Sequence, residues 1–211
     1  MDYIAYLLAF LMAYLIGSIP FGLVLTKLAG YGDIRQIGSG NIGATNVLRT
    51  GNKLLALATL ILDSGKGAFA VIVVGLFYNI HHFYFPAEYP WDPAIIMALT
   101  GLFAILGHCF PVWLKFKGGK GVATTIGTLL AAVPYAGLAA CIVWLLMAFT
   151  FRISSLAALT AMAAAPLVTL YFYGVTPAVI CALITILVFW RHKDNIKRLL
   201  KGEEPRIGKK K

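Results

Sequence analysis

Long stretches without charged residues dominate this sequence and decide the environment in which the chain can fold. Windows of about 20 residues carry almost no charge, a length that matches the hydrocarbon core of a bilayer. Apolar and aromatic residues make up 60% of the 211 residues, and the mean hydropathy is +0.84. A soluble domain of this size cannot hide so much apolar surface from water. We therefore predict an all-α integral membrane protein with one polytopic domain over residues 1–211.

Three apolar segments at the start of the chain predict uninterrupted membrane spans. They are Tyr3–Thr26, Leu54–Phe77 and Ala94–Gly107. The first segment differs from a cleaved signal peptide because its apolar run is too long and Asp2 stands where a basic region is expected. We therefore interpret it as a retained first span.

A longer apolar block, Val122–Trp190, divides into four further spans, which gives seven transmembrane helices. The divisions fall at Pro134, at the polar residues around Arg152, and at Gly174. A proline or glycine inside a membrane helix sometimes only kinks it, so five spans are the alternative if Pro134 and Gly174 are kinks. Both numbers are odd, so both models place the two termini on opposite sides.

The distribution of basic residues predicts the orientation. Of the 18 lysines and arginines, 17 lie outside the predicted spans and on one side of the seven-span model, the exception being Lys66. The positive-inside rule then places the N-terminus outside and the C-terminus in the cytoplasm. Three polar segments, residues 30–53, 107–121 and 191–198, share the cytoplasmic side. The net charge of +10 therefore indicates anionic headgroups and anionic substrates as partners, and no nucleic acid.

The first polar segment is rich in glycine and precedes a helical pattern. Bare backbone amides at the start of a helix bind phosphate, and Ser39 or Asn41 is suited to cap such a helix. An ordinary capped turn is the alternative. The residues of interest are Gly38, Ser39, Gly40, Asn41, Gly43, Thr45, Asn46 and Arg49.

The second polar segment holds Lys120 within a glycine run that includes Gly118 and Gly119. The spacing differs from that of a P-loop, because Gly121 follows the lysine where serine or threonine is required. A flexible loop with a lysine still suits an anion. We interpret the two other lysines of this segment as anchors at the membrane surface.

The third polar segment, Arg191 to Arg198, directly follows the last span. His192 and Asn195 are three residues apart and share one helix face. The basic residues of the other face suit anionic headgroups. A basic stop-transfer tail is the alternative, but it leaves the pairing of histidine and asparagine unexplained.

Two smaller features complete the set of candidates. Asp63 and Lys66 lie three residues apart inside the second span, and we expect them to pair with each other. Ser154 and Ser155 begin a span on the cytoplasmic side. They are helix caps or phosphate donors.

Together, the motifs resemble one family. SGNIGATN at residues 39–46, GHCFP at 107–111, KGGKGVAT at 117–124 and RHKDNI at 191–196 occur in this order. This pattern is similar to the bacterial acyl-phosphate:glycerol-3-phosphate acyltransferases over essentially the whole chain. One departure is Asp194, where that family typically has glutamate.

The resemblance implies a phospholipid-synthesis reaction in the bacterial inner membrane, with the active site facing the cytoplasm. An acyl phosphate donates its fatty acyl group to the primary hydroxyl of glycerol 3-phosphate, giving lysophosphatidic acid and phosphate. The reaction implies no cofactor and no metal, and it suggests functional coupling to the enzyme that makes acyl phosphate. A membrane transporter for an organic phosphate or a phospholipid is the alternative function.

These considerations select the candidate site residues. We predict five catalytic residues, namely Ser39, Arg49, Lys120, His192 and Asn195. The general base stays open between His192 and the donor's own phosphate, and Ser39 is a third option as an acyl-carrying nucleophile. The predicted phosphate-binding residues are Ser39, Gly40, Asn41, Gly43, Thr45, Asn46, Arg49, Gly118, Gly119, Lys120, Ser155, His192 and Asn195.

Overall fold

The computed structural model describes residues 3–84 and 92–208, and within those ranges it contains helices and no strand. A chain in lipid must pair its backbone groups internally, which favours helices. The α-helices are α1 (Tyr3–Gly17), α2 (Phe21–Leu28), α3 (Ala44–Val47), α4 (Lys53–Tyr84), α5 (Pro93–Cys109), α6 (Val122–Ala132), α7 (Pro134–Phe151), α8 (Ser154–Tyr173), α9 (Val175–Arg191) and α10 (Lys193–Leu200). Short 3₁₀ turns are η1 (Ile34–Gln36), η2 (Leu48–Thr50) and η4 (Val112–Leu114).

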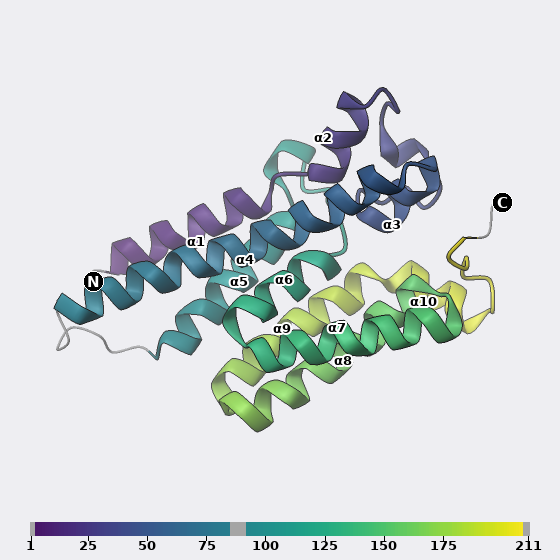
Figure 1. Cartoon of the computed structure of the whole chain (residues 1–211). Helices are drawn as coiled ribbons and strands as arrows, with labels where there is room; N and C mark the ends of the chain where they lie inside the picture. The colour runs from purple at the N-terminus through teal and green to yellow at the C-terminus, as the bar shows by residue number, and fades with distance from the viewer. Residues whose placement is uncertain (1–2, 85–91, 209–211) are drawn as a thin grey trace.

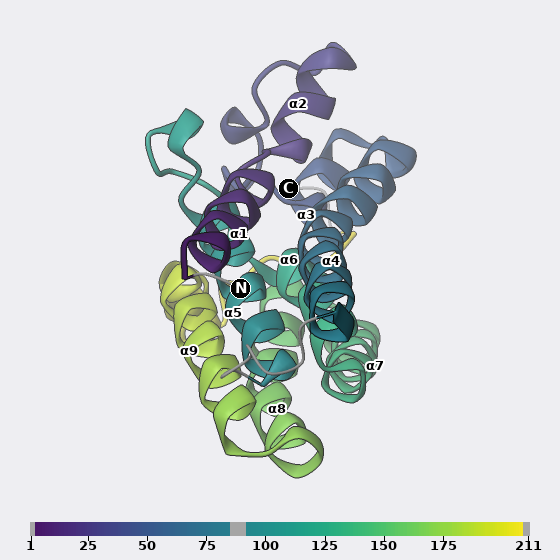
Figure 2. The same cartoon turned by 90° about the vertical axis from the view of Figure 1, so that its left-hand side faces the viewer.

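The long helices form an elongated bundle with α5 at its centre (Figures 1 and 2). Helix α5 contacts α1, α4, α6 and α9, while α7 packs on α6 and α8 and thereby completes the bundle. Side chains of α5 such as Ala104 and Ile105 are fully covered. Large apolar side chains such as Leu146 and Phe149 are exposed on the outside, a surface that suits lipid.

Within the part of the chain that the structure describes, helix length supports five or six complete membrane spans. The five long apolar segments are Ile4–Leu28, Lys53–Ile80, Pro93–Leu114, Pro134–Phe151 and Ser154–Tyr173. The pair α9 and α10, bent by 65°, is the sixth if the two helices count as one span. Helix α6 has 11 residues, so it is about 16 Å long and covers roughly half of a hydrocarbon core. Seven complete crossings therefore stay a prediction.

Pro134 and Gly174 each lie between two helices that pack side by side. Pro134 is the first residue of α7, where its missing N–H costs no hydrogen bond. Gly174 has a φ of +83°, a backbone conformation that glycine adopts without strain. The break predicted at each residue is confirmed, while the number of complete crossings depends on helix length.

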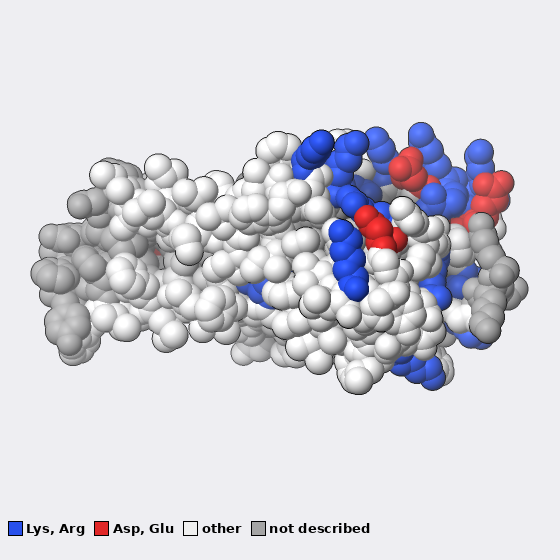
Figure 3. Space-filling view, turned by 90° about the horizontal axis from the view of Figure 1, so that it is seen from above, with Lys and Arg blue, Asp and Glu red and all other residues white. Residues whose placement is uncertain are grey.

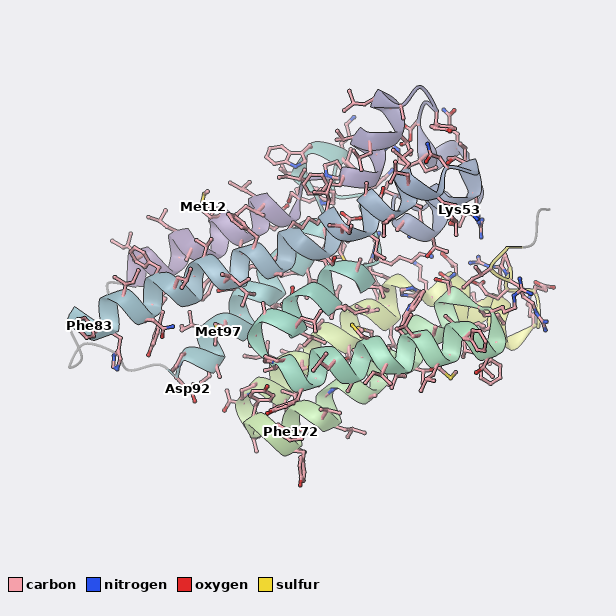
Figure 4. The ribbon with its side chains drawn as sticks, in the orientation of Figure 1. Met12, Lys53, Phe83, Asp92, Met97 and Phe172 are labelled. Atoms are coloured by element: carbon pink, nitrogen blue, oxygen red, sulfur yellow. The ribbon has the colours of Figure 1, made fainter. Side chains whose placement is uncertain are left out.

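Lysine and arginine side chains gather at one end of the bundle (Figure 3). We call this end, which carries Lys53 and α10, the basic end (Figures 1 and 4). Phe83 and Asp92 lie at the opposite end (Figure 4). The predicted segregation of basic residues is confirmed for the described residues, while Lys209, Lys210 and Lys211 lie outside them. The assignment of the basic end to the cytoplasm stays a prediction.

The two ionisable residues of the second span are paired. Lys66 Nζ lies 2.8 Å from Asp63 Oδ1, and both side chains are buried. The same ammonium group donates to the carbonyl oxygen of Ile19 at 2.7 Å. This carbonyl lies between α1 and α2, so the lysine also stabilises the break between them. The predicted pairing is confirmed.

Candidate active site

Three segments far apart in the sequence line one cavity of about 210 Å³. The segments come from the loop after α2, the loop between α5 and α6, and the junction of α9 with α10. The three segments therefore meet at this cavity, and of the five predicted catalytic residues Ser39 and Lys120 line it while Arg49, His192 and Asn195 do not. The roles of these residues stay a prediction. The lining residues are Ser39, Gly40, Asn41, Gly118, Lys120, Trp190, Arg191, Lys193 and Asp194.

Asn46 organises the first segment from within. Its side chain is 1% exposed, and Nδ2 donates to the carbonyl oxygens of Ile34, Ile37 and Asn41 at 3.0, 2.9 and 2.8 Å. Its Oδ1 accepts from the Ser39 amide at 3.0 Å and from the Ser39 hydroxyl at 3.2 Å. Both polar atoms of Asn46 are thus occupied, so the prediction that it donates to a phosphate does not fit. Asn46 shapes the loop that presents Ser39 to the cavity.

The helix predicted to begin in the first segment is short. Helix α3 has four residues, and its N-cap is Gly43, which provides no side-chain cap. The predicted capping by Ser39 or Asn41 is therefore wrong. Four residues also produce little helix dipole. Affinity for an anion at this segment must come from side chains and loop amides, because this helix is too short to supply it.

Arg49 and Thr45 lie close to the loop but are not among the residues that line the cavity. Arg49 packs over Gly38, since a Cβ atom added there would lie 2.5 Å from Arg49 Cδ. Its side chain is exposed. The Thr45 hydroxyl lies 3.1 Å from that of Ser154 and so links the first segment to the start of α8. Arg49 is therefore an exposed arginine beside the loop of Ser39, and its binding of a phosphate stays a prediction.

Gly118 and Gly119 use their backbone groups within the protein. The amide of Gly118 donates to the Cys109 carbonyl at 3.1 Å, and that of Gly119 donates to the His108 carbonyl at 3.0 Å. Their own carbonyls accept from the Arg191 guanidinium. The sequence predicts that these two glycines bind phosphate, but in this structure their N–H groups are already hydrogen-bonded within the protein. The loop instead serves to hold Lys120.

Lys120 is the cation that this loop brings into the cavity. Its Nζ donates a hydrogen bond to Oδ1 of Asn195. Burial lowers the pKa of Lys120 to about 8, with the positive charge of Arg198 as the next cause. Near neutral pH the amine is therefore still mostly protonated. Because the charged amine is partly buried, it is poorly hydrated, and this favours the binding of an anion in place of water.

His192 occupies the junction between α9 and α10 and is buried. Its Nδ1 lies 2.8 Å from the Val188 carbonyl oxygen. A carbonyl only accepts, so Nδ1 carries the proton and Nε2 keeps its lone pair. Burial lowers the pKa of His192 to about 4, which keeps the ring neutral. A neutral Nε2 accepts a hydrogen bond from a hydroxyl and does not donate to a phosphate oxygen.

Glu204 belongs to the site region, although the sequence analysis missed it. Its carboxylate accepts from the Ser155 hydroxyl at 2.7 Å, from Nδ2 of Asn195, and from Nε of Arg198 at 2.7 Å. Burial raises the pKa of Glu204, but these hydrogen bonds outweigh it and leave the pKa below its usual value. The available signal is the acidic pair Glu203 and Glu204 in an otherwise basic tail, which does not tell the two residues apart. Ser155 is thus occupied by a carboxylate of the chain itself.

Comparisons with known proteins agree with these observations. The sequence model of the glycerol-3-phosphate acyltransferase family matches residues 7–202. A glycerol-3-phosphate acyltransferase of Paramagnetospirillum magneticum is 59% identical over 96% of this chain and 94% of its own length. That of Rhodospirillum rubrum is 57% identical over 95% of this chain and 90% of its own length.

Two solved structures share the fold. Both are crystal structures of PlsY, an integral membrane glycerol 3-phosphate acyltransferase, in the glycerol 3-phosphate form and the lysophosphatidic acid form. Both are 38% identical and cover 97% of this chain and 96% of their own, with TM-scores of 0.83 and 0.80. The chain therefore belongs to the glycerol-3-phosphate acyltransferase family, whose membrane-embedded helical fold it shares.

Proposed function

We propose that the protein transfers a fatty acyl group from an acyl phosphate to the primary hydroxyl of glycerol 3-phosphate. The products are 1-acyl-glycerol 3-phosphate, a lysophosphatidic acid, and inorganic phosphate. The observation that supports this most is that Lys120 and the Ser39–Asn41 loop line the same cavity as the α9–α10 junction. The two solved relatives, described in glycerol 3-phosphate and lysophosphatidic acid forms, support the same acceptor and product.

The cavity suits one acceptor and one donor at a membrane surface. A fatty acyl chain gains about 0.8 kcal/mol per buried CH₂, so the donor partitions into the bilayer with its phosphate at the interface. The acceptor is small and anionic, and it arrives from water. In our proposal the basic end faces the cytoplasm of a bacterial cell and the bundle lies in its inner membrane. The positive-inside rule and the gathering of basic residues support this orientation (Figure 3).

Lys120 and Arg49 are the proposed phosphate-binding cations. The ammonium of Lys120 is half-buried and projects from the loop that lines the cavity. Arg49 lies over Gly38, next to the loop residues Ser39 and Gly40. Arginine binds a phosphate through two parallel hydrogen bonds, whereas lysine acts as a point charge. Two cations on two segments offset the repulsion between the two substrate phosphates.

His192 and Asn195 act beside Lys120 in this proposal. The neutral Nε2 of His192 accepts the hydrogen bond of the attacking hydroxyl and so orients it toward the acyl carbon. Asn195 fixes the lysine through the hydrogen bond between Lys120 Nζ and Oδ1. Holding both reactants in attack geometry supplies much of the acceleration when the donor is already an activated anhydride.

The proton balance favours the donor phosphate as its final acceptor. The hydroxyl oxygen forms a bond to the acyl carbon, and the bond from this carbon to the phosphate oxygen breaks. His192, whose pKa is about 4, is a weak base at neutral pH. The phosphate leaving group is the stronger base and takes the hydroxyl proton. His192 then orients the attacking hydroxyl by accepting its hydrogen bond, and it does not take up the proton.

A covalent intermediate on Ser39 is less well supported. The Ser39 hydroxyl lies 3.2 Å from Oδ1 of Asn46, to which it donates its hydrogen. An amide oxygen is not a base that can activate a nucleophile. We therefore propose direct transfer, with Ser39 as a hydrogen-bond donor once substrate is bound. A trapped acyl group on a peptide containing Ser39 would contradict this proposal.

The proposed donor is tested with purified protein in lipid vesicles. The protein receives glycerol 3-phosphate with either palmitoyl phosphate or palmitoyl-CoA, and both lysophosphatidic acid and inorganic phosphate are measured. We expect equal amounts of the two products with acyl phosphate and no product with acyl-CoA. Product from acyl-CoA at a comparable rate would overturn the choice of donor. Substrate flux into vesicles without acyl transfer would favour a transporter.

A further inference from the structure

We propose that Arg191 is a positioning residue that fixes the Lys120 loop to the end of α9. The inference rests on the proposed function, because it concerns how that reaction's cation is placed. Nε of Arg191 donates to the Gly119 carbonyl at 3.0 Å. One terminal nitrogen, Nη2, donates to the Gly118 carbonyl at 2.8 Å. One guanidinium therefore spans two successive carbonyls just before Lys120.

The guanidinium is itself held in place by aromatic side chains. Its central carbon lies 5.3 Å from the ring centre of Phe110 and 5.9 Å from that of Trp190. A planar guanidinium stacks on such rings and keeps its hydrogen bonds in the plane, which an ammonium group does not do. Phe110 directly follows α5 and Trp190 belongs to α9. Arg191 thus connects the ends of two helices with the loop between α5 and α6.

Hydrogen bonds on the other side of the loop complete the arrangement. The Gly118 and Gly119 amides donate to the carbonyls of Cys109 and His108 at the end of α5. Arg191 engages the carbonyls of the same two glycines from α9. A glycine pair has little conformational preference of its own. Its conformation, and therefore the direction in which Lys120 leaves the loop, is set by these partners.

Arg191 connects two residues that take part in the proposed reaction, His192 and Lys120. Its neighbour is His192, whose ring is anchored to Val188 of the same helix. By binding the loop that carries Lys120, Arg191 fixes the separation between the phosphate-binding cation and the hydroxyl acceptor. A displacement of about 1 Å between such groups costs on the order of 100-fold in rate.

The test compares Arg191→Lys, which keeps the positive charge, with Arg191→Gln and the wild-type protein. Lys197→Gln is the matched control, because it removes one exposed positive charge from α10 at the same end of the bundle. Rates of lysophosphatidic acid formation from palmitoyl phosphate are measured for each protein in vesicles. We expect both Arg191 variants to lose about 10- to 100-fold in kcat/KM. We expect Lys197→Gln to stay within about twofold of wild type.

A second readout separates positioning from direct substrate binding. The reactivity of the Lys120 amine toward an acylating label is followed against pH by peptide mass spectrometry, without substrate. In Arg191→Lys the charges around Lys120, including Arg198, Glu204 and Asp194, are unchanged. A released loop exposes the amine to water, so we expect the midpoint of labelling to move upward from its value near 8.

The outcomes distinguish the inference from the proposed function. A loss of activity together with a raised midpoint supports positioning. Wild-type activity in Arg191→Lys overturns it, and so does lost activity with an unchanged midpoint, which would place Arg191 on the substrate itself. An inactive wild-type protein would instead reject the proposed function. If Arg191→Lys does not fold, as judged by its melting temperature, the activity of Arg191→Gln alone decides, and wild-type activity in that variant overturns the inference. Its labelling midpoint does not enter, because loss of the Arg191 charge by itself raises the pKa of Lys120.

Discussion

Lys120 Nζ donates a hydrogen bond to Oδ1 of Asn195, and this bond joins the loop between α5 and α6 to helix α10. The other end of the asparagine amide donates to Glu204 in the C-terminal segment. Asn195 is therefore oriented from one side by a carboxylate and presents its oxygen to the lysine on the other. This chain of contacts fixes a half-buried cation at the edge of the cavity.

The first prediction concerns the charge of Lys120. We expect Lys120→Gln to lower kcat/KM for acyl transfer by about 10- to 100-fold, because a hydrogen bond from a charged group contributes roughly 1.5–3 kcal/mol. Lys117→Gln, which removes an exposed charge three residues away, is the control and should leave the rate nearly unchanged. Equal losses in both variants would indicate a general effect of surface charge.

The second prediction concerns alkaline pH. The pKa of Lys120 is lowered to about 8, so the amine is charged below that pH and neutral above it. A neutral amine does not attract phosphate, and we expect kcat/KM to fall as the pH rises through about 8. A bound phosphate favours the charged form of Lys120, so the corresponding decrease in kcat should appear at a higher pH than the decrease in kcat/KM. Lys120→Gln should show no such decrease in kcat/KM at alkaline pH. A decrease that persists in this variant would have to come from another titrating group.

The third prediction concerns the histidine at the end of α9. Because Nε2 of His192 orients the attacking hydroxyl in our proposal, His192→Ala should lower kcat by about 100-fold or more. The wild-type rate should show no acidic limb near pH 6.5 from this residue, since its pKa is about 4. A limb near pH 6.5 that disappears in His192→Ala would contradict the neutral ring.

The fourth prediction concerns stability at the C-terminal segment. Glu204→Ala leaves the buried donors of Ser155 and Asn195 without their carboxylate, and each unpaired buried donor costs about 1–3 kcal/mol. The Arg198 guanidinium also loses this partner but is partly exposed to water. We expect a clear drop in the melting temperature of the purified protein. The neighbouring Glu203 is exposed, so Glu203→Ala should change stability by about 0.5 kcal/mol or less. Equal melting temperatures for the two variants would show that Glu204 is not structurally important.

The fifth prediction concerns the contact between α1 and α5. A Cβ atom at Gly107 would lie 2.1 Å from the Tyr14 carbonyl oxygen, and one at Gly17 would lie 2.0 Å from that of Ala104. Small residues of this kind let membrane helices approach closely. Gly107→Ala should therefore destabilise the bundle. Gly65→Ala in α4 meets no atom within 4 Å and should be neutral or slightly stabilising. Equal effects would contradict this packing.

Sequence patterns predicted the helical segments well, because hydrophobic length and proline or glycine breaks act locally. The breaks at Pro134 and Gly174 and the pairing of Asp63 with Lys66 are of this kind. Helix length needed the structure, since the apolar run of α6 looks like a span but ends after 11 residues.

The site was predictable in composition but not in the roles of its residues. Motif spacing identified the three segments, yet Asn46 is occupied inside its loop and the Gly119 amide donates to the His108 carbonyl. These are tertiary contacts, and no local rule indicates which donors remain free. Glu204 was missed for the same reason, because its partners Ser155 and Asn195 come from other helices or turns of the chain.

The central claim, that the three segments share one side of the membrane, is tested most directly by labelling. Single cysteines replace the exposed residues Arg49, Lys117 and Lys197 in a variant whose native cysteines, Cys109, Cys141 and Cys181, are alanine. A membrane-impermeant maleimide is then added to sealed vesicles of known orientation. We predict that all three positions react from the cytoplasmic side. Labelling of any one of them only from the opposite side would contradict a common site.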